Sequence, residues 1–239
     1  MRKITFISAY YENPQMLQKQ VENIYNYPQH VKDNLEVIFV DDCSQDHPAK
    51  EVLNRLSLGC DLKLYRALVD VRWNQDFCRN LAASKAKHPW LFLTDIDHLL
   101  PEETLSELME AEYINETLTY RFGRLTYPEM TAYKHHPNTW FMHKSVWDKT
   151  GGYDERFRGF YGTDGDFASR VKRASEIVQI DDLKVLRVPR EAVPDASTTR
   201  YGRKEEIDKT ITQISKDRAK IKGWKPENLL TPWEEVELY

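Results

Sequence analysis

Trp90-Leu91-Phe92-Leu93-Thr94-Asp95-Ile96-Asp97-His98 is the most informative stretch of this 239-residue chain. Its first four residues form a short apolar run, which is typical of a strand buried on both faces in a parallel sheet. The run ends at two carboxylates, and Pro101 and Glu102 then open a helical stretch. Ligands of open α/β sheets bind outside the carboxyl ends of the strands. The sequence therefore predicts a ligand site at Asp95 and Asp97, where paired carboxylates suit a hard divalent cation.

The pattern upstream of this stretch alternates between strands and helices. Such alternation predicts an α/β fold with a mainly parallel sheet, wound by right-handed crossovers and flanked by helices. A second apolar run also ends on a carboxylate pair, Asp41 and Asp42. The expected strands are residues 4–9, 35–40, 62–67 and 90–93, and the expected helices are 16–25, 49–56, 77–87 and a stretch that begins near 102.

The second half of the chain has a different composition. Aromatic residues crowd the region after Glu112, and residues 198–225 carry nine Lys or Arg against four Asp or Glu. Isoleucines in that basic segment recur at helical spacing, which predicts a helical C-terminal tail with a solvated cationic face. We expect one α/β domain over residues 1–195, divided into 1–112 and 113–195, and a basic helical tail over 196–239.

Composition narrows the class of protein. Hydrophobic content of 41% and charged content of 30% fit a soluble globular domain. A net charge of −4 gives no overall attraction to nucleic acid or to an anionic membrane. The three cysteines are dispersed and lack metal-binding spacing, which is typical of a reducing compartment. No apolar run approaches the ~20 residues of a membrane span. A cytoplasmic protein without a membrane span is therefore expected.

A third acidic position follows a glycine-rich, loop-like run at residues 151–162. Asp164 lies there, immediately before a helical pattern at 167–172. A carboxylate at the start of a helix can serve as a cap for free backbone N–H groups. It can also serve as a general base, and the local pattern leaves both roles open.

Five fragments in this order resemble the family 2 glycosyltransferases of the GT-A fold, over about residues 3 to 190. The resemblance implies transfer of a sugar from a nucleoside-diphosphate donor, most simply a UDP-sugar, with inversion and with Mn²⁺ or Mg²⁺ as cofactor. The fragments are Ser8-Ala9-Tyr10-Tyr11-Glu12-Asn13-Pro14, Val40-Asp41-Asp42-Cys43-Ser44-Gln45-Asp46, Arg79-Asn80, Leu93-Thr94-Asp95-Ile96-Asp97, and Gly151-Gly152-Tyr153-Asp154-Glu155 with Gly162-Thr163-Asp164.

The resemblance also implies roles for individual residues. Asp97 and Asp95 would hold the metal, with His98 as a further candidate ligand, and Asp164 would be the general base. The expected donor contacts are Ala9, Tyr10, Tyr11, Glu12, Asp41, Asp42, Arg79 and Asp95. The expected acceptor contacts are Trp140, Gly152, Tyr153, Thr163 and Asp166.

Some positions depart from the family pattern and leave alternatives open. Thr163 stands where the family usually has Glu, and Asn74-Gln75-Asp76 replaces its Asn-x-Gly. No histidine follows His143, so a third metal ligand would come from Asp181, Asp182 or water. A degenerate nucleotide-sugar-binding or interaction module is one alternative function. Another alternative is transfer to a hydroxylated nucleobase in DNA. The basic tail favours this alternative, whereas the overall negative charge does not. The acceptor is otherwise expected to be a glycan or another hydroxyl-bearing molecule.

A nucleotidyltransferase is a less favoured rival on a similar sheet. That chemistry usually follows the first strand with a glycine-rich phosphate loop, and here the loop is Tyr10-Tyr11-Glu12-Asn13-Pro14. A phosphatase that uses Asp-x-Asp would want Thr or Val where Leu99 stands. The residues therefore favour glycosyl transfer.

Overall fold

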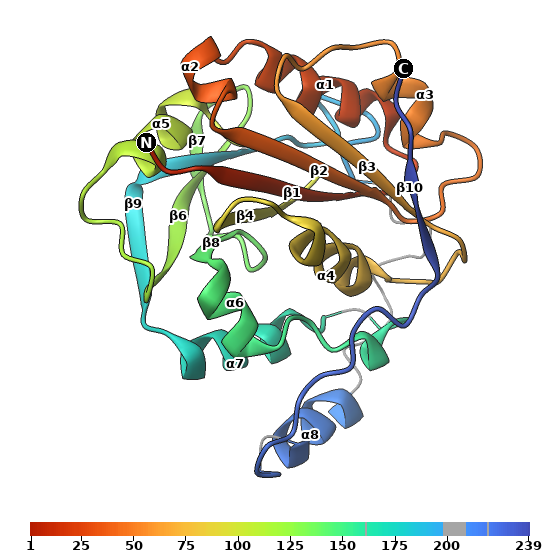
Figure 1. Cartoon of the computed structure of the whole chain (residues 1–239), viewed down its shortest axis with the longest axis vertical. Coiled ribbons are helices and arrows are strands. Elements are labelled where there is room, and N and C mark those ends of the chain that lie inside the picture. Colours follow the sequence, from red (N-terminus) through yellow and green to blue (C-terminus); the bar gives the residue numbers. More distant parts are fainter. Residues whose placement is uncertain (161, 198–208, 219) are drawn as a thin grey trace.

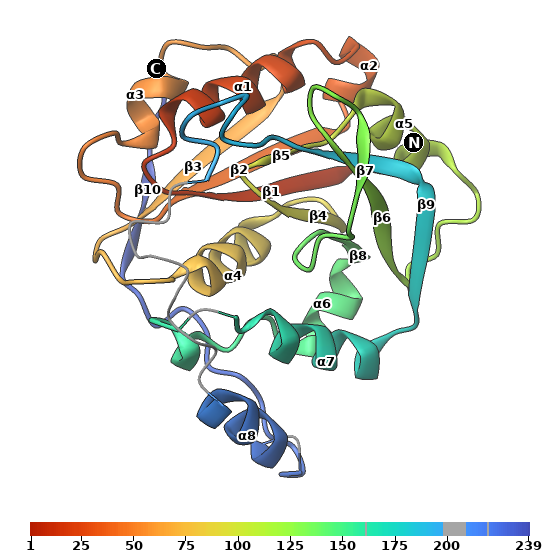
Figure 2. The ribbon, with the colours of Figure 1, turned by 180° about the vertical axis from the view of Figure 1, so that it is seen from behind.

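The structure is a computed structural model that describes residues 1–160, 162–197, 209–218 and 220–239. One mixed sheet runs through the molecule, with helices on both of its faces (Figures 1 and 2). Along the sheet the strands follow the order β10-β3-β2-β1-β4-β8-β6-β9-β5, and β7 pairs with β6.

The parallel part of the sheet is the part that the sequence predicted. It contains β1 (Ile4–Tyr10), β2 (Leu35–Asp41), β3 (Asp61–Ala67) and β4 (Trp90–Asp95). β1 lies between β2 and β4, and all three pairings within this group are parallel. Consecutive parallel strands require a crossover, and helices supply it. The carboxyl ends of these strands therefore meet at one edge of the sheet.

Helices cover the sheet as two layers. In Figure 1, α1, α2, α3 and α5 lie above the sheet, and α4, α6 and α7 lie below it. The Gly151 backbone ends α6 in a left-handed conformation with φ of 76°, where glycine is favoured because it has no Cβ. The helices are α1 (Pro14–Tyr25), α2 (Gln29–Lys32), α3 (Ala49–Leu53), α4 (Gln75–Lys85), α5 (Glu102–Glu110), α6 (Lys144–Thr150), α7 (Asp164–Ala174) and α8 (Lys209–Arg218), with a 3₁₀ turn at Glu155–Phe157.

The second half of the sheet is largely antiparallel. The pairings of β4 with β8, β8 with β6, and β9 with β5 are antiparallel, whereas β6 and β9 run parallel. The sequence did not predict these strands, because aromatic and polar residues interrupt their apolar runs. Their bounds are β5 (His98–Leu99), β6 (Thr119–Thr126), β7 (Thr131–Tyr133), β8 (Trp140–His143) and β9 (Ile177–Arg187).

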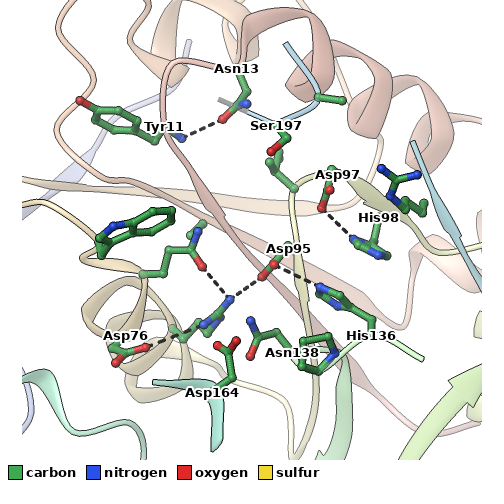
Figure 3. Close-up of a pocket in the computed structure, with 18 of the residues that line it drawn as sticks. Tyr11, Asn13, Asp76, Asp95, Asp97, His98, His136, Asn138, Asp164 and Ser197 are labelled. Atoms are coloured by element: carbon green, nitrogen blue, oxygen red, sulfur yellow. Dashed lines mark hydrogen bonds and ion pairs between the residues drawn. The ribbon is translucent and has the colours of Figure 1, made fainter. Parts of the chain in front are cut away.

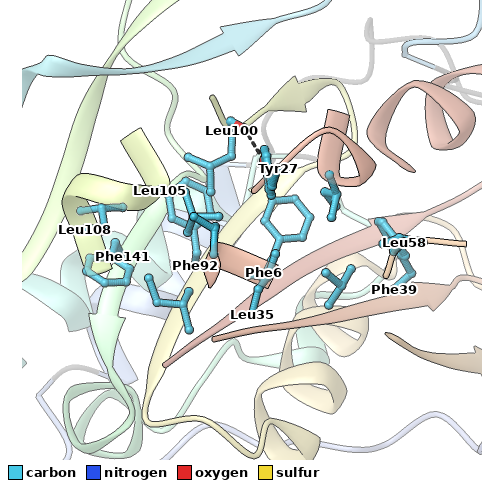
Figure 4. Close-up of a cluster of buried hydrophobic side chains, with 14 of the residues drawn as sticks. Phe6, Tyr27, Leu35, Phe39, Leu58, Phe92, Leu100, Leu105, Leu108 and Phe141 are labelled. Atoms are coloured by element: carbon cyan, nitrogen blue, oxygen red, sulfur yellow. Dashed lines mark hydrogen bonds between the residues drawn. The ribbon is translucent and has the colours of Figure 1, made fainter. Parts of the chain in front are cut away.

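The main hydrophobic core lies between the sheet and the upper helix layer (Figure 4). Phe6 stacks on Phe92 at a ring-centroid distance of 6.0 Å, and Phe92 stacks on Phe122 at 5.6 Å. Each ring comes from a different strand, so the stack joins the parallel and antiparallel halves of the sheet. The core therefore makes β4, whose end carries Asp95, one of the most firmly held strands.

The C-terminal region contains both a helix and a strand. α8 confirms that the tail is helical over Lys209–Arg218, whereas Ile207 of the predicted helix falls outside the described residues. After α8 the chain returns to the sheet, and β10 (Trp233–Val236) pairs antiparallel with β3. The sequence did not predict this strand. Among the described residues, no helix has both the length and the apolar content that crossing a membrane requires.

Candidate functional site

A pocket of about 310 Å³ lies at the carboxyl ends of β1, β2 and β4 (Figure 3). Tyr11 follows β1, Asp42 follows β2, and Asp95 ends β4, and all three residues line the pocket. This is the edge of the sheet at which the sequence predicted a ligand. A pocket of this size with convergent polar groups is typical of a small-molecule site.

Asp95 is held between two cationic or hydrogen-bonding side chains. Arg79 Nη2 donates to Oδ1, and His136 Nε2 lies 3.2 Å from Oδ2 (Figure 3). Arg79 extends from α4 and is only 2% exposed. Burial alone would raise the pKa of Asp95, but the Arg79 guanidinium and His136 hold it well below its usual range. Asp95 is therefore a fixed carboxylate whose two oxygens are already engaged.

Asp97 is oriented by a chain of two hydrogen bonds. Arg124 Nη1 lies 3.0 Å from His98 Nε2, and His98 Nδ1 lies 2.7 Å from Asp97 Oδ1. A guanidinium only donates, so Nε2 must accept and the ring proton must sit on Nδ1. His98 therefore donates to Asp97 as a neutral imidazole. This bond fixes one carboxylate oxygen of Asp97.

His136 completes the surroundings of both carboxylates. Its ring stacks on that of His98 with centroids 3.9 Å apart. Its Nδ1 accepts from Thr139 Oγ1 at 2.8 Å, since Nε2 must carry the proton that faces Asp95. Burial lowers the pKa of His136. The two stacked imidazoles thus connect Asp95 and Asp97 through a single rigid cluster.

Asp164 reaches the pocket from the opposite side, as the first residue of α7 (Figure 3). The N-cap residue Thr163 makes no side-chain capping bond, and its hydroxyl donates instead to Asp76 Oδ2 at 3.2 Å. Burial raises the pKa of Asp76 to about 7, and the nearby charge of Asp164 contributes. Asp76 was not among the residues that the sequence predicted for the site.

The predicted donor-binding residues divide into two groups. Ala9, Tyr10, Tyr11, Asp42 and Arg79 all line the pocket. Within this group Asp42 accepts from Asn74 Nδ2 at 2.9 Å, and burial raises its pKa to about 7. A ligand hydroxyl or base N–H would find this carboxyl at the pocket wall.

Glu12 and Asp41 form the second group, and both bond to the backbone of the loop after β2. Glu12 accepts from the amides of Gln45, Asp46 and His47 at 2.5 to 3.1 Å. Asp41 accepts from the amides of Ser44 and Ala49 at 2.8 and 2.9 Å. Neither residue lines the pocket. Their contacts shape the loop that carries Asp42.

Comparison with known proteins identifies the family. The model of glycosyl transferase family 2 matches residues 5–176, more than half of the chain. The chain belongs to that family. No curated protein matches the sequence. The strand-end acids and Asp164 all lie inside the region that matches the family 2 model.

Solved structures share the GT-A fold of this chain. The mannosyltransferase PcManGT from Pyrobaculum calidifontis, in complex with GDP-Man and Mn²⁺, has a TM-score of 0.62 and 19% identity. Residues 1–349 of TarS from S. aureus, in complex with UDP-GlcNAc, have a TM-score of 0.65 and 16% identity. These matches cover 81% and 83% of this chain but only 58% and 62% of the two longer chains.

The residues predicted for acceptor binding fall into two groups, according to whether they line the pocket. Thr163 lines the pocket, whereas Trp140, Gly152, Tyr153 and Asp166 do not. Trp140 and Tyr153 are each 1% exposed and pack against Phe167 of α7. Asp166 pairs with Arg170 at 2.7 Å, and Arg170 in turn donates to the carbonyl of Gly152. In this structure these four residues support the helix that carries Asp164.

The side chains around Asp97 determine whether the pocket fits the divalent cation that the family implies. Within the described residues, no group of three or more His, Cys, Asp or Glu side chains is arranged to hold a metal. Asp97 nevertheless lines the pocket, and the hydrogen bond that a described residue makes to its carboxylate is at Oδ1. Mg²⁺ and similar hard ions need only one or two carboxylates when substrate phosphates and water complete the shell. The residues therefore fit such an ion at Asp97.

Several pocket residues were missing from the sequence prediction. His136 and Asn138 come from the loop before β8, Arg124 from β6 and Arg187 from β9. Their positions depend on pairing between strands that the sequence did not predict. The pair His135-His136 next to Pro137 was the one local signal that could have drawn attention to this loop.

Proposed function

We propose that this protein is a metal-dependent, inverting glycosyltransferase that moves a hexose or pentose from a UDP-sugar to an acceptor hydroxyl. The observation that carries this proposal is the meeting of Asp97, the Arg79–Asp95 pair and Asp164 in one pocket. Membership of glycosyl transferase family 2 supports it, as do related folds bound to UDP-GlcNAc and to GDP-Man with Mn²⁺.

The donor would occupy the side of the pocket formed by the ends of β1 and β2. Tyr11 offers an aromatic face to the nucleoside, and the buried Asp42 offers a hydrogen bond to it. Asp97 would hold Mn²⁺ or Mg²⁺ against the diphosphate, where the ion neutralises charge on the leaving group. Arg79 and Asp95 form a fixed ion pair on the pocket floor, and this pair would orient the transferred sugar.

Asp164 would act as the general base. A carboxylate there takes the proton from the acceptor hydroxyl as its oxygen forms a bond to the anomeric carbon. The bond between that carbon and the diphosphate oxygen breaks on the opposite face, so the configuration inverts. Asp164 lines the pocket, so its carboxylate would be within reach of an acceptor that binds there.

The substitution Asp164→Asn tests this role. We expect donor hydrolysis, in which water takes the place of the acceptor, to fall by about 10²–10⁴-fold because the base is lost. UDP affinity, measured by calorimetry with Mn²⁺, should change less than about twofold, since the side chain keeps its size. UDP release from a panel of UDP- and GDP-sugars, with Mn²⁺ or EDTA, is the measurement.

Asp148→Asn is the matched control, because Asp148 is exposed on α6 and does not line the pocket. Equal loss of UDP binding and of hydrolysis in Asp164→Asn would contradict the role of base. If no nucleotide sugar binds to the wild-type protein, the binding-module alternative also fails, and the proposed donor class is wrong.

A further inference from the structure

Three cationic side chains line one end of the pocket, and two of them lie against the ring of Tyr133. We call Arg124, Lys134 and Arg187 the Tyr133 cation group. The Arg124 and Arg187 guanidinium carbons lie 4.7 and 4.9 Å from the Tyr133 ring centroid. Lys134 follows Tyr133 in the chain, and all four residues line the pocket. None of them is needed to explain how Asp164, Asp95 or Asp42 is positioned.

Strand pairing explains why these residues meet. Arg124 on β6 is the register partner of Tyr133 on β7 and of Val185 on β9. Arg187 lies two residues beyond Val185, so it points to the same face of the sheet as Arg124. His98 on β5 is the register partner of Arg187. The sheet therefore fixes Arg124, Arg187 and Tyr133 relative to one another, and Lys134 follows directly after β7.

The group carries positive charge that no carboxylate of the described residues neutralises by an ion pair. The side chain of Arg124 is 6% exposed, and its hydrogen bonds go to the Lys134 carbonyl and to neutral His98, at 2.7 and 3.0 Å. Burial lowers the pKa of Arg124, and Arg187 lowers it further, although Asp97 opposes both. Holding a buried cation next to like charges costs free energy. An anion bound there would recover this cost.

The proposed donor does not supply that anion. The diphosphate of a nucleotide sugar and a divalent cation at Asp97 cancel each other's charge. Three positive side chains then still face the pocket, and the carboxylates that act on Arg124 are Asp97 and the more distant Asp95, which is already paired with Arg79. The anion must therefore belong to a second ligand that enters the pocket at the Tyr133 end.

We propose that the Tyr133 cation group binds a phosphate ester on the acceptor, an inference that rests on the proposed glycosyl transfer. Arginine forks bind phosphate oxygens in pairs, and Tyr133, 44% exposed, offers a face to the adjoining polyol or sugar. A nucleic-acid backbone would need cations along an extended track. The group is compact and lies in the pocket, so it fits a single anionic substituent close to the reacting hydroxyl.

The test is calorimetric titration of glycerol 3-phosphate into the full chain saturated with UDP and Mn²⁺. We expect binding to persist with UDP bound, and to weaken about tenfold in Arg187→Gln and further in Lys134→Gln/Arg187→Gln. Arg190→Gln is the matched control, because Arg190, three residues after Arg187, is exposed and does not line the pocket. Affinity for UDP should change less than about twofold in all three variants.

Competition between UDP and glycerol 3-phosphate would overturn the proposal, because the cations would then hold the donor diphosphate. Equal glycerol 3-phosphate affinity in the double variant and the wild type would also overturn it. So would tight, steeply salt-dependent binding of a DNA oligonucleotide without any binding of glycerol 3-phosphate. If UDP does not bind, the donor assignment fails by itself, and loss of glycerol 3-phosphate binding in the UDP-free variants still supports the anion site.

Discussion

Asp76 is a buried carboxyl in the pocket lining, and its protonation should make the stability of the protein depend on pH. It is 5% exposed, and burial raises its pKa to about 7 even though Arg79 lies 3.9 Å away. Between about pH 4 and pH 7, the folded protein therefore keeps a proton on Asp76 that the unfolded chain has already released. Stability should fall as the pH rises through this window, because the native state binds more protons than the unfolded state.

Asp76→Asn should remove the share of this pH dependence that Asp76 contributes, while Asp42, whose pKa burial also raises to about 7, keeps its own share. At pH 8 we expect the variant to be more stable than the wild type by roughly 2–4 kcal/mol, since each pKa unit corresponds to about 1.4 kcal/mol. At pH 4 the two proteins should unfold at similar urea concentrations. Urea unfolding from pH 4 to pH 8 measures the difference, with the exposed Asp148→Asn as control. A constant stability gap across this range would show that Asp76 does not titrate in it.

At the scale of elements, several contacts join the C-terminal segment to the glycine-rich loop, and the buried side chain of Glu155 makes two of them. Glu155 is fully buried and accepts from Asn80 Nδ2 and from the amides of Leu229 and Leu230, each at 2.7 Å. Asn80 is the neighbour of Arg79 on α4. Glu155 therefore connects the segment before β10 to the helix that positions Asp95.

Glu155→Ala should loosen this segment, although the Asn228–Gly151 bond, the Arg156–Glu227 pair and β10 still hold it. One buried donor, Asn80 Nδ2, and two partly buried amides would lose their acceptor, so we expect a loss of roughly 2–3 kcal/mol in the free energy of unfolding. Amide exchange at Leu229 and Leu230 should accelerate as well. Glu155→Gln keeps one acceptor oxygen and should have an intermediate effect. Glu110→Ala, at the exposed end of α5, is the control. Undiminished protection of both leucine amides in Glu155→Ala would contradict this role.

At the scale of the whole molecule, the pocket draws on both halves of the sheet. Tyr11 and Asp42 come from the parallel half, whereas Arg124 and Arg187 come from the β6–β9 half. A ligand that contacts both halves binds only the folded state, so it must stabilise the protein by mass action. The size of this effect depends on whether the donor and the metal bind together.

UDP with Mn²⁺ should therefore raise the melting temperature. At about 100 times the dissociation constant, stabilisation is about 2.7 kcal/mol, which corresponds to roughly 5–10 °C for a chain of this size. EDTA or Asp97→Ala should remove most of the shift, because Asp97 is the proposed metal ligand. Differential scanning fluorimetry measures this shift, with Asp148→Ala as control. An undiminished shift in EDTA would argue against a metal-dependent donor site.

The parallel strands and the strand-end acids were predictable from the sequence because their signals are local. A run such as residues 90–93 is apolar over its whole length, and Asp95 and Asp97 follow it directly. The order of the fragments then sufficed to indicate the family. For Asp164, local sequence showed a carboxylate at a helix start, and the structure adds that this helix start faces the pocket.

Which side chains surround these acids depends on the tertiary structure. His136 reaches Asp95, and Arg124 meets Arg187, because β6, β8 and β9 pair across separations of many residues along the chain. Glu12 looked like a pocket residue, yet its carboxylate binds the backbone of a distant loop. Local pattern determines what an element is and where it ends. The register between distant strands determines what each side chain faces, and no short stretch of sequence encodes that register.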